Sequence, residues 1–159
     1  MTSTLREELR QQKPFVSLEQ EAHLSIVRTG SLLTDAIEQL LKPFDVTATQ
    51  YNVLRILRGA EPRGLCRNDL RDRMLTKMPD VTRLLDRMED AKLVARARDS
   101  EDRRLVSTRI TSKGLRLLEE LEDAVYATHE SCFRQLGKTQ LRALIDMLAI
   151  VREGLESSR

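Results

Sequence analysis

Residues 64–114 decide the fold, and they read GLCRNDLRDRMLTKMPDVTRLLDRMEDAKLVARARDSEDRRLVSTRITSKG. A short helix is predicted from about Cys66 to Met74, and a second helix has Pro79–Met88 in its body. Two extended runs follow, over 93–98 and 104–110, and the turn that joins them is rich in Asp, Ser and Glu. Two helices followed by a charged hairpin predict a winged helix-turn-helix.

The second helix of this stretch has one buried stripe. Its apolar residues recur at i, i+3, i+4 and i+7, which places them on one face: Val81, Leu84, Leu85 and Met88. The residues between them are left on the outer faces: Thr82, Arg83, Asp86 and Arg87. A helix with a buried back and an Arg-bearing front fits a DNA major groove, where Arg pairs bidentately with guanine.

The start of this helix is predicted from local chemistry. We take Thr76 as the N-cap and place Pro79 in the first turn, where a missing backbone N–H is tolerated. The residues that we assign to the DNA-reading surface of the helix and its approach are Lys77, Pro79, Thr82, Arg83 and Arg87.

Basic residues are concentrated in this part of the chain. Residues 63–116 hold 15 Lys and Arg against 9 Asp and Glu, a net charge of +6. The remaining residues carry −4, so the whole-chain charge of +2 conceals a basic module. Such a module is typical of a phosphate-binding surface. The alternative is a solvated face with scattered Arg, which is what a charge run alone usually indicates.

The end of this stretch resembles the wing signature of the MarR (multiple antibiotic resistance regulator) family. Asp102-Arg103-Arg104 matches its Asp-x-Arg, and Ile110-Thr111-Ser112-Lys113-Gly114 matches its (Leu/Ile)-Thr-x-x-Gly. Val81–Glu89 followed by Leu93-Val94 resembles its recognition helix and first wing strand. The family usually has Gly where this chain has Lys92, so the helix must end here without the easy positive φ of glycine.

The resemblance implies distinct roles for three wing residues. Arg104 is the side chain that would enter the minor groove, which attracts Arg most where A·T pairs narrow it. Arg103 would contact the DNA backbone or solvent. Asp102 cannot favour a phosphate, so we expect it to stabilise the wing through a neighbouring Arg or backbone N–H groups.

The rest of the chain is predicted to be helical. Ser17–Gln20 and Thr47–Gln50 have the form of capping boxes, and Thr111 is a further N-cap. Within one compact unit we expect an N-terminal arm and dimerisation or linker helix (1–45), a winged helix-turn-helix (46–114) and C-terminal dimerisation helices (115–159). The predicted fold class is mostly α with a small β-hairpin wing.

The last helix carries an apolar stripe close to heptad spacing, at Leu141, Leu144, Leu148, Val151 and Leu155. Little chain remains to cover this stripe, and a partner subunit is the simplest way to bury it. We therefore expect a homodimer.

Composition bounds the remaining possibilities. Aromatic residues are 3% of the 159 and Trp is absent, which disfavours stacking on single-stranded nucleic acid. The N-terminus has no apolar signal core, and no apolar run approaches the roughly 20 residues that span a bilayer. A cytoplasmic protein without membrane contact is expected. No serine-hydrolase order, phosphate loop or zinc Cys-x-x-Cys is present, so we predict neither an enzyme nor a cofactor or metal.

The resulting hypothesis is a sequence-specific regulator that binds double-stranded DNA at a pseudo-palindromic operator, as a ligand-responsive repressor. The resemblance implies a crevice between the dimerisation helices and the winged module, for a small aromatic or phenolic effector. His23, Gly30 and Tyr51 lie on helices that would border it. A ligand there would favour a spacing of recognition helices that no longer matches successive major grooves.

Two alternatives stay open. One is a thiol- or metal-responsive sensor on the same scaffold, in which Cys66 is activated by a helix N-terminus and nearby Arg. His129 and Cys132 are i, i+3, but two ligands are too few for a metal, and a buried Cys is the default. The other alternative is a helical protein–protein adaptor that does not bind DNA.

Overall fold

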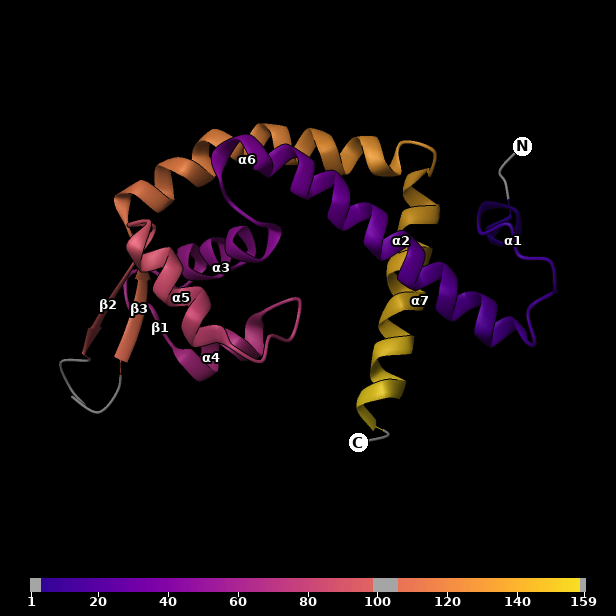
Figure 1. Ribbon diagram of the computed structural model, residues 1–159, viewed down its shortest axis with the longest axis horizontal. Coiled ribbons are helices and arrows are strands. Elements are labelled where there is room, and N and C mark those ends of the chain that lie inside the picture. Colours follow the sequence, from indigo (N-terminus) through magenta and orange to yellow (C-terminus); the bar gives the residue numbers. More distant parts are fainter. Residues whose placement is uncertain (1–3, 99–105, 158–159) are drawn as a thin grey trace. The chain divides into compact units, whose positions relative to one another are not determined.

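The structure is a computed structural model that describes residues 4–98 and 106–157. The chain divides into two compact units, Met1–Leu121 and Glu122–Arg159, and each is considered by itself (Figure 1). The elements of the first unit are, in chain order, α1 (Leu5–Glu8), α2 (Leu18–Leu41), the 3-10 helix η1 (Lys42–Phe44), α3 (Ala48–Gly59), β1 (Leu65–Cys66), α4 (Arg67–Arg73), α5 (Val81–Asp90), β2 (Val94–Arg98) and β3 (Val106–Ile110). Helix α6 (Ser112–Phe133) begins in the first unit and ends in the second, which also holds α7 (Lys138–Ser157).

The predicted fold class is confirmed, because helices predominate and one small antiparallel sheet forms the wing. Strands β2 and β3 pair from Val94 with Ile110 to Arg98 with Val106, as the hairpin prediction requires. A third strand, β1, was not predicted; it pairs with β3 and gives the order β1-β3-β2. The wing residues Asp102, Arg103 and Arg104 lie outside the described residues.

Helix α3 contributes fully buried residues to the hydrophobic core. Val53, Leu54 and Leu57 are fully buried, and the stripe of α5 packs into the same cluster. The predicted stripe is confirmed: Val81, Leu84, Leu85 and Met88 are each at most 4% exposed. Burying one side of α5 in this way fixes which of its faces is presented to solvent.

Helix starts follow local capping chemistry. Thr47 and Gln50 form the predicted capping box, with Gln50 N–H 3.2 Å from Thr47 Oγ1 and Thr47 N–H 2.9 Å from Gln50 Oε1. The box predicted at Ser17 is only half formed. Ser17 Oγ accepts from Gln20 N–H, but Gln20 Oε1 accepts from the N–H of Val16, one residue earlier than a capping box requires.

Helix α5 ends in a left-handed turn at Lys92, whose φ is 61°. The N–H of Lys92 donates to Glu89 O at 2.8 Å and that of Leu93 to Met88 O at 2.9 Å, the two bonds of a Schellman motif. Glycine normally adopts this conformation because it lacks a Cβ. Lys92 adopts it here, so the exit is made at some cost in backbone strain.

The start of α6 is attached to this exit. Thr111 Oγ1 donates to Lys92 O at 2.7 Å and accepts from Gly114 N–H at 3.1 Å, which confirms the predicted N-cap. Lys113 Nζ donates to Ala91 O at 2.8 Å. A Cβ on Gly114 would lie 2.5 Å from Leu93 O, so only glycine fits there. The Thr-x-x-Gly sequence thus joins α6 closely to the end of α5.

No helix in the described ranges has both the length and the apolarity needed to cross a membrane.

Candidate nucleic-acid interface

The exposed face of α5 begins one turn later than its sequence suggests. Thr76 is not the N-cap; Asp80 is, and its Oδ1 accepts from Arg83 N–H at 3.0 Å. Lys77 and Pro79 therefore precede the helix instead of starting it. The physical reason is that proline disfavours helical backbone at Met78, the residue before it, while Asp80 supplies a strong cap.

Arg83 is the most prominent cation of this face, with its side chain 83% exposed. Its Nε lies 3.1 Å from Asp80 Oδ2, one turn away on the same helix. An exposed pair of this kind is weak, so Arg83 can leave Asp80 for a stronger bidentate partner such as guanine.

The two other predicted residues on α5 are also exposed. Thr82 Oγ1 accepts from Arg67 Nη1 at 3.3 Å, which links α5 to α4. Arg87 Nε donates to Arg83 O at 3.3 Å, so its side chain lies back along the helix. The structure thus brings Thr82, Arg83 and Arg87 onto one exposed surface, opposite the buried stripe.

The loop before α5 is held by a contact with α3. Leu75 N–H donates to Asn52 Oδ1 at 3.1 Å, while the Leu75 side chain is 84% exposed. Lys77 and Pro79 are exposed in the same loop. Their backbone is therefore positioned next to the N-terminus of α5, where positive helix-dipole charge also favours an anion.

Strand β2 is joined to α5 by one arginine. Arg96 Nη1 lies 2.7 Å from Asp86 Oδ1, and its Nε donates to Glu89 Oε2 at 2.9 Å. Its Nη2 also donates to Glu89 Oε2, and its backbone N–H donates to Glu89 Oε1 at 3.0 Å. The side-chain and backbone hydrogen bonds from Arg96 lower the pKa of Glu89, and the bond to Glu89 raises the pKa of Arg96. In the sequence Arg96 is distinguished only as one of the 15 Lys and Arg of residues 63–116.

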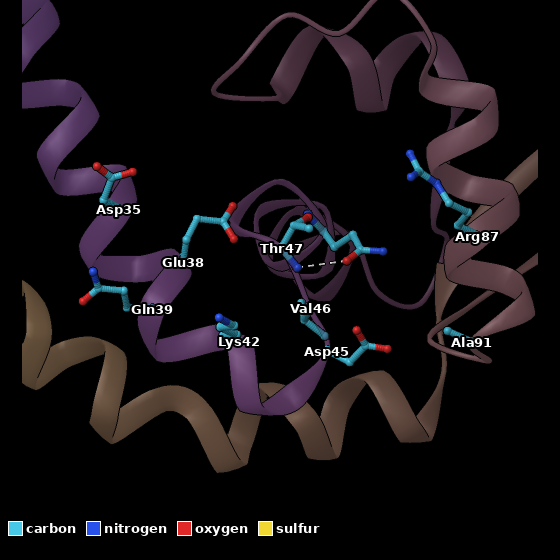
Figure 2. Close-up of a pocket in the computed structure, with 10 residues that line it drawn as sticks. Asp35, Glu38, Gln39, Lys42, Asp45, Val46, Thr47, Arg87 and Ala91 are labelled. Carbon is cyan, nitrogen blue, oxygen red and sulfur yellow. Dashed lines mark hydrogen bonds between the residues drawn. The ribbon is translucent and has the colours of Figure 1, made fainter.

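A pocket of about 670 Å³ lies between the end of α2, the start of α3 and the outer side of α5 (Figure 2). Glu38 on α2 points toward α3 and accepts from Ala48 N–H at 2.8 Å. Arg87 and Ala91 line the pocket from α5, and the other lining residues are Asp35, Gln39, Lys42, Asp45, Val46, Thr47 and Gln50. The pocket therefore places charged groups of α2 opposite the helix predicted to read DNA.

The three residues predicted to border a crevice do not line this pocket. Tyr51 packs against the hydrophobic core, and His23 is exposed on α2. A Cβ on Gly30 would meet nothing within 4 Å. Their role in ligand binding stays a prediction, and the sequence did not point to Glu38, Lys42 or Asp45, which lie at the α2–α3 corner.

The cysteines have structural environments without an evident sensor site. Cys66 is half-buried and is the N-cap of α4, where its Sγ accepts from Asp69 N–H at 3.5 Å. Cys132 is exposed, so the default expectation of a buried thiol is wrong for it in this chain, because its side of α6 is uncovered. Among the residues that the structure describes, no three His, Cys, Asp or Glu side chains are grouped as metal ligands.

The stripe of α7 is only partly covered. Leu141, Leu144 and Leu148 are half-buried, whereas Val151 is 47% and Leu155 66% exposed. Ile145, Met147 and Ile150 add further exposed apolar surface to the same helix, each more than half exposed. Exposed apolar side chains gathered on one element are typical of a protein–protein contact surface.

Comparison with known proteins gives a consistent result. The model of the MarR family matches residues 44–105. The HTH-type transcriptional regulator FarR of Neisseria gonorrhoeae is 29% identical over 136 residues, which cover 86% of this chain and 92% of that protein.

Two solved structures are similar over nearly their whole length. A MarR transcription factor from Planctomyces limnophilus is 39% identical, with a TM-score of 0.65, and the match covers 86% of this chain and 99% of that one. BpsR of Bordetella bronchiseptica is 25% identical with a TM-score of 0.76, covering 88% and 98%. The DNA binding of BpsR is regulated by 6-hydroxynicotinic acid.

Proposed function

This chain belongs to the MarR family, and we propose that it is a sequence-specific regulator that binds double-stranded DNA and represses transcription as a homodimer. The observation that carries the proposal is the division of α5 into two faces. Its apolar stripe is buried in the core, and the opposite side presents Thr82, Arg83 and Arg87. A ten-residue helix held in this way can insert its exposed side into a major groove.

The wing gives the second DNA contact. Arg98 and Arg109 are exposed on β2 and β3, and Asp102, Arg103 and Arg104 follow β2 in the sequence. In the proposed complex, Arg104 enters the minor groove beside the half-site and Asp102 stabilises the turn. Such a contact favours A·T-rich flanks because a narrow minor groove has an enhanced negative potential.

Exposed apolar surface supports a homodimer. The uncovered part of the α7 stripe is one such surface, with Val151 and Leu155 at its end. Another lies on α2, where Leu18 is 80% and Val27 56% exposed. Two-fold symmetry then requires a pseudo-palindromic operator whose half-sites are about 10 base pairs apart, or a multiple of that spacing.

The pocket between α2 and α5 supports regulation by a small molecule. It has room for a single aromatic ring with polar substituents, and its lining offers both cations and carboxylates, so a phenolic hydroxyl, which donates and accepts hydrogen bonds, suits it. The ligand-regulated BpsR supports an effector of this size. A molecule bound to Arg87 would act on the recognition helix directly, and it would favour the conformations of the protein in which that helix is displaced from DNA.

The deciding experiment is selection of bound duplexes from random DNA by the purified protein. We expect a pseudo-palindrome whose affinity falls steeply with salt. Recovery of no sequence, with no salt-dependent binding, would favour a protein–protein adaptor. Loss of binding on mild oxidation or chelation, reversed by thiol or metal, would favour a sensor. A Cys66→Ser variant, which retains a helix-capping oxygen, is the control for the oxidation experiment.

A further inference from the structure

We propose that Arg96 is a positioning residue that fixes the wing against the recognition helix, so that the protein measures the distance between its two DNA contacts. Asp86 and Glu89 on α5 bind its guanidinium. The proposal rests on the proposed function, because it concerns how α5 and the wing act together on one duplex. The net charge of residues 63–116 would by itself make Arg96 no more than one of the cations of a basic module.

Arg96 links β2 to the C-terminal half of α5. Its side chain is 27% exposed and its guanidinium contacts two carboxylates, one turn apart on α5. Asp86 and Glu89 face the strand together because residues three apart share one side of a helix. A planar guanidinium can hold two carboxylates at fixed angles, which an ammonium cannot do.

The backbone of β2 is also attached to α5. This strand is an outer strand of the sheet, and it pairs with β3 on one side only. The N–H of Arg96 donates to Glu89 Oε1 on α5 at 3.0 Å. Glu89 therefore holds both the backbone and the side chain of the same residue. This double attachment fixes the direction in which β2 leaves α5, and hence the position of the wing.

The cluster formed by Arg96, Asp86 and Glu89 is a poor phosphate site. One cation is surrounded by two carboxylates, so the cluster has a net charge of −1, and a phosphate would have to displace an existing charge-assisted hydrogen bond. Arg98, two residues further along β2, is exposed and is not part of the cluster. Arg98 is therefore the control residue. Replacing it removes a positive charge from β2 but leaves the contacts between β2 and α5 in place.

A fixed wing has a consequence for the operator. The recognition helix contacts the half-site and the wing contacts the flank, so a rigid link accepts the A·T-rich flank at one distance only. A loose link would accept it at several distances. Arg96 thus contributes to sequence specificity by fixing the distance between the half-site and the A·T-rich flank, although neither Arg96 nor its partners contact a base.

The test uses full-length Asp86→Asn, Glu89→Gln and Arg96→Met variants. Affinity is measured on duplexes in which the A·T-rich flank is moved stepwise, one base pair at a time, relative to the selected half-site. We expect the wild type to prefer one position by about tenfold, a ratio equal to 1.4 kcal/mol, and the variants to lose most of that preference. Asp86→Asn and Glu89→Gln should also weaken binding at the best position, although each makes the protein more positive.

Arg98→Met is the control, because it removes the same charge from the same strand. It should reduce affinity without broadening the preferred flank position. The salt dependence gives a second readout: Arg96→Met should leave the slope of log K against log salt unchanged, whereas loss of a phosphate contact lowers it by about one. Hydrogen exchange without DNA gives a third, since the Arg96 amide should exchange faster in Glu89→Gln.

Three results would overturn the inference. One is tighter binding by Asp86→Asn or Glu89→Gln, which would show that Arg96 acts as a released charge. Another is an unchanged flank preference in all three variants, and the third is a shallower salt slope for Arg96→Met. If the wild type itself binds no duplex, the proposed function fails instead, and the exchange experiment still reports whether Glu89 holds the strand.

Discussion

Helices α5 and α7 have similar apolar patterns but very different surroundings. On α5 the stripe is covered by other residues of the same chain, and Leu85 and Met88 are 2% and 0% exposed. On α7 the same kind of spacing leaves Ile150 68% and Leu155 66% exposed. Periodicity thus predicts that a helix has an apolar face. Whether the same chain covers that face is seen only in the tertiary structure.

The largest expected effect tests the intramolecular side of this comparison. Leu84→Ala should lower the free energy of unfolding by about 2–5 kcal/mol, because it leaves a cavity beneath α5. Urea unfolding should give the same loss at low and at high protein concentration. Leu155→Ala is the matched change on α7, and its effect should grow with concentration because it acts through a partner subunit. Equal, concentration-independent losses would contradict the distinction between the two helices.

The next prediction tests the intermolecular side directly. Replacing Leu148 and Leu155 together with Glu places two charges in the proposed subunit interface. Burial of unpaired charge is strongly unfavourable, so the variant should be a monomer or should aggregate. Light scattering measures the result, and circular dichroism checks that the helices persist. An unchanged dimer would show that α7 is not the interface.

Much of the fold around α5 could be predicted from sequence, because the residues that determine it lie close together in the chain. The stripe of four apolar residues and the caps at Thr47 and Thr111 involve neighbours three to seven positions apart. The N-cap of α5 was predicted wrongly because two local rules compete there. Proline at 79 was taken as a first-turn residue, whereas its effect on Met78 shifts the start to Asp80.

The missed features depend on contacts between separate elements. Strand β1 has only Leu65 and Cys66, too few residues to show an alternating pattern, and it exists because it pairs with β3 far along the chain. The bonds from Arg96 to α5 depend on the angle at which β2 leaves the helix. The chain turns between the two elements at Lys92, whose positive φ no propensity rule favours.

A third prediction addresses the exposed face of α5. Arg83→Ala should cost about 1–3 kcal/mol in operator binding and relax the preference at one base position per half-site. The fold should be unaffected, because the pair with Asp80 is exposed and therefore weak. Titration of operators with single base changes measures the effect. A uniform loss on every sequence would show that Arg83 holds a phosphate.

A fourth prediction concerns the end of α5. Lys92→Gly should raise the free energy of unfolding by up to about 1 kcal/mol, because glycine adopts a φ of 61° without strain. The neighbouring Ala91→Gly is the control; its φ is −73°, so glycine there should be destabilising. Thermal unfolding of both variants gives the comparison. Stabilisation by both changes, or by neither, would count against strain at Lys92.

The smallest effect is expected from pH. The pKa of Glu89 is lowered below its ordinary 4.5 by hydrogen bonds from Arg96, so its contribution to stability is present above that value. It is lost as the pH falls through the lowered pKa. The difference in stability between wild type and Glu89→Gln should therefore be constant from neutral pH to about 4.5 and then diminish. A difference that instead grows on acidification would contradict the direction of the shift.

The double attachment of Arg96 also bears on how the chain avoids aggregation. An outer β-strand with free N–H and C=O groups is a template on which a strand of another molecule can grow. In β2 the Arg96 N–H is occupied by Glu89, and the exposed Arg98 adds positive charge to the strand, which repels an identical strand. A second copy could pair with β2 at this position only after Glu89 had been displaced. The contact that we propose for DNA recognition would thus also oppose edge-to-edge pairing of folded molecules through β2.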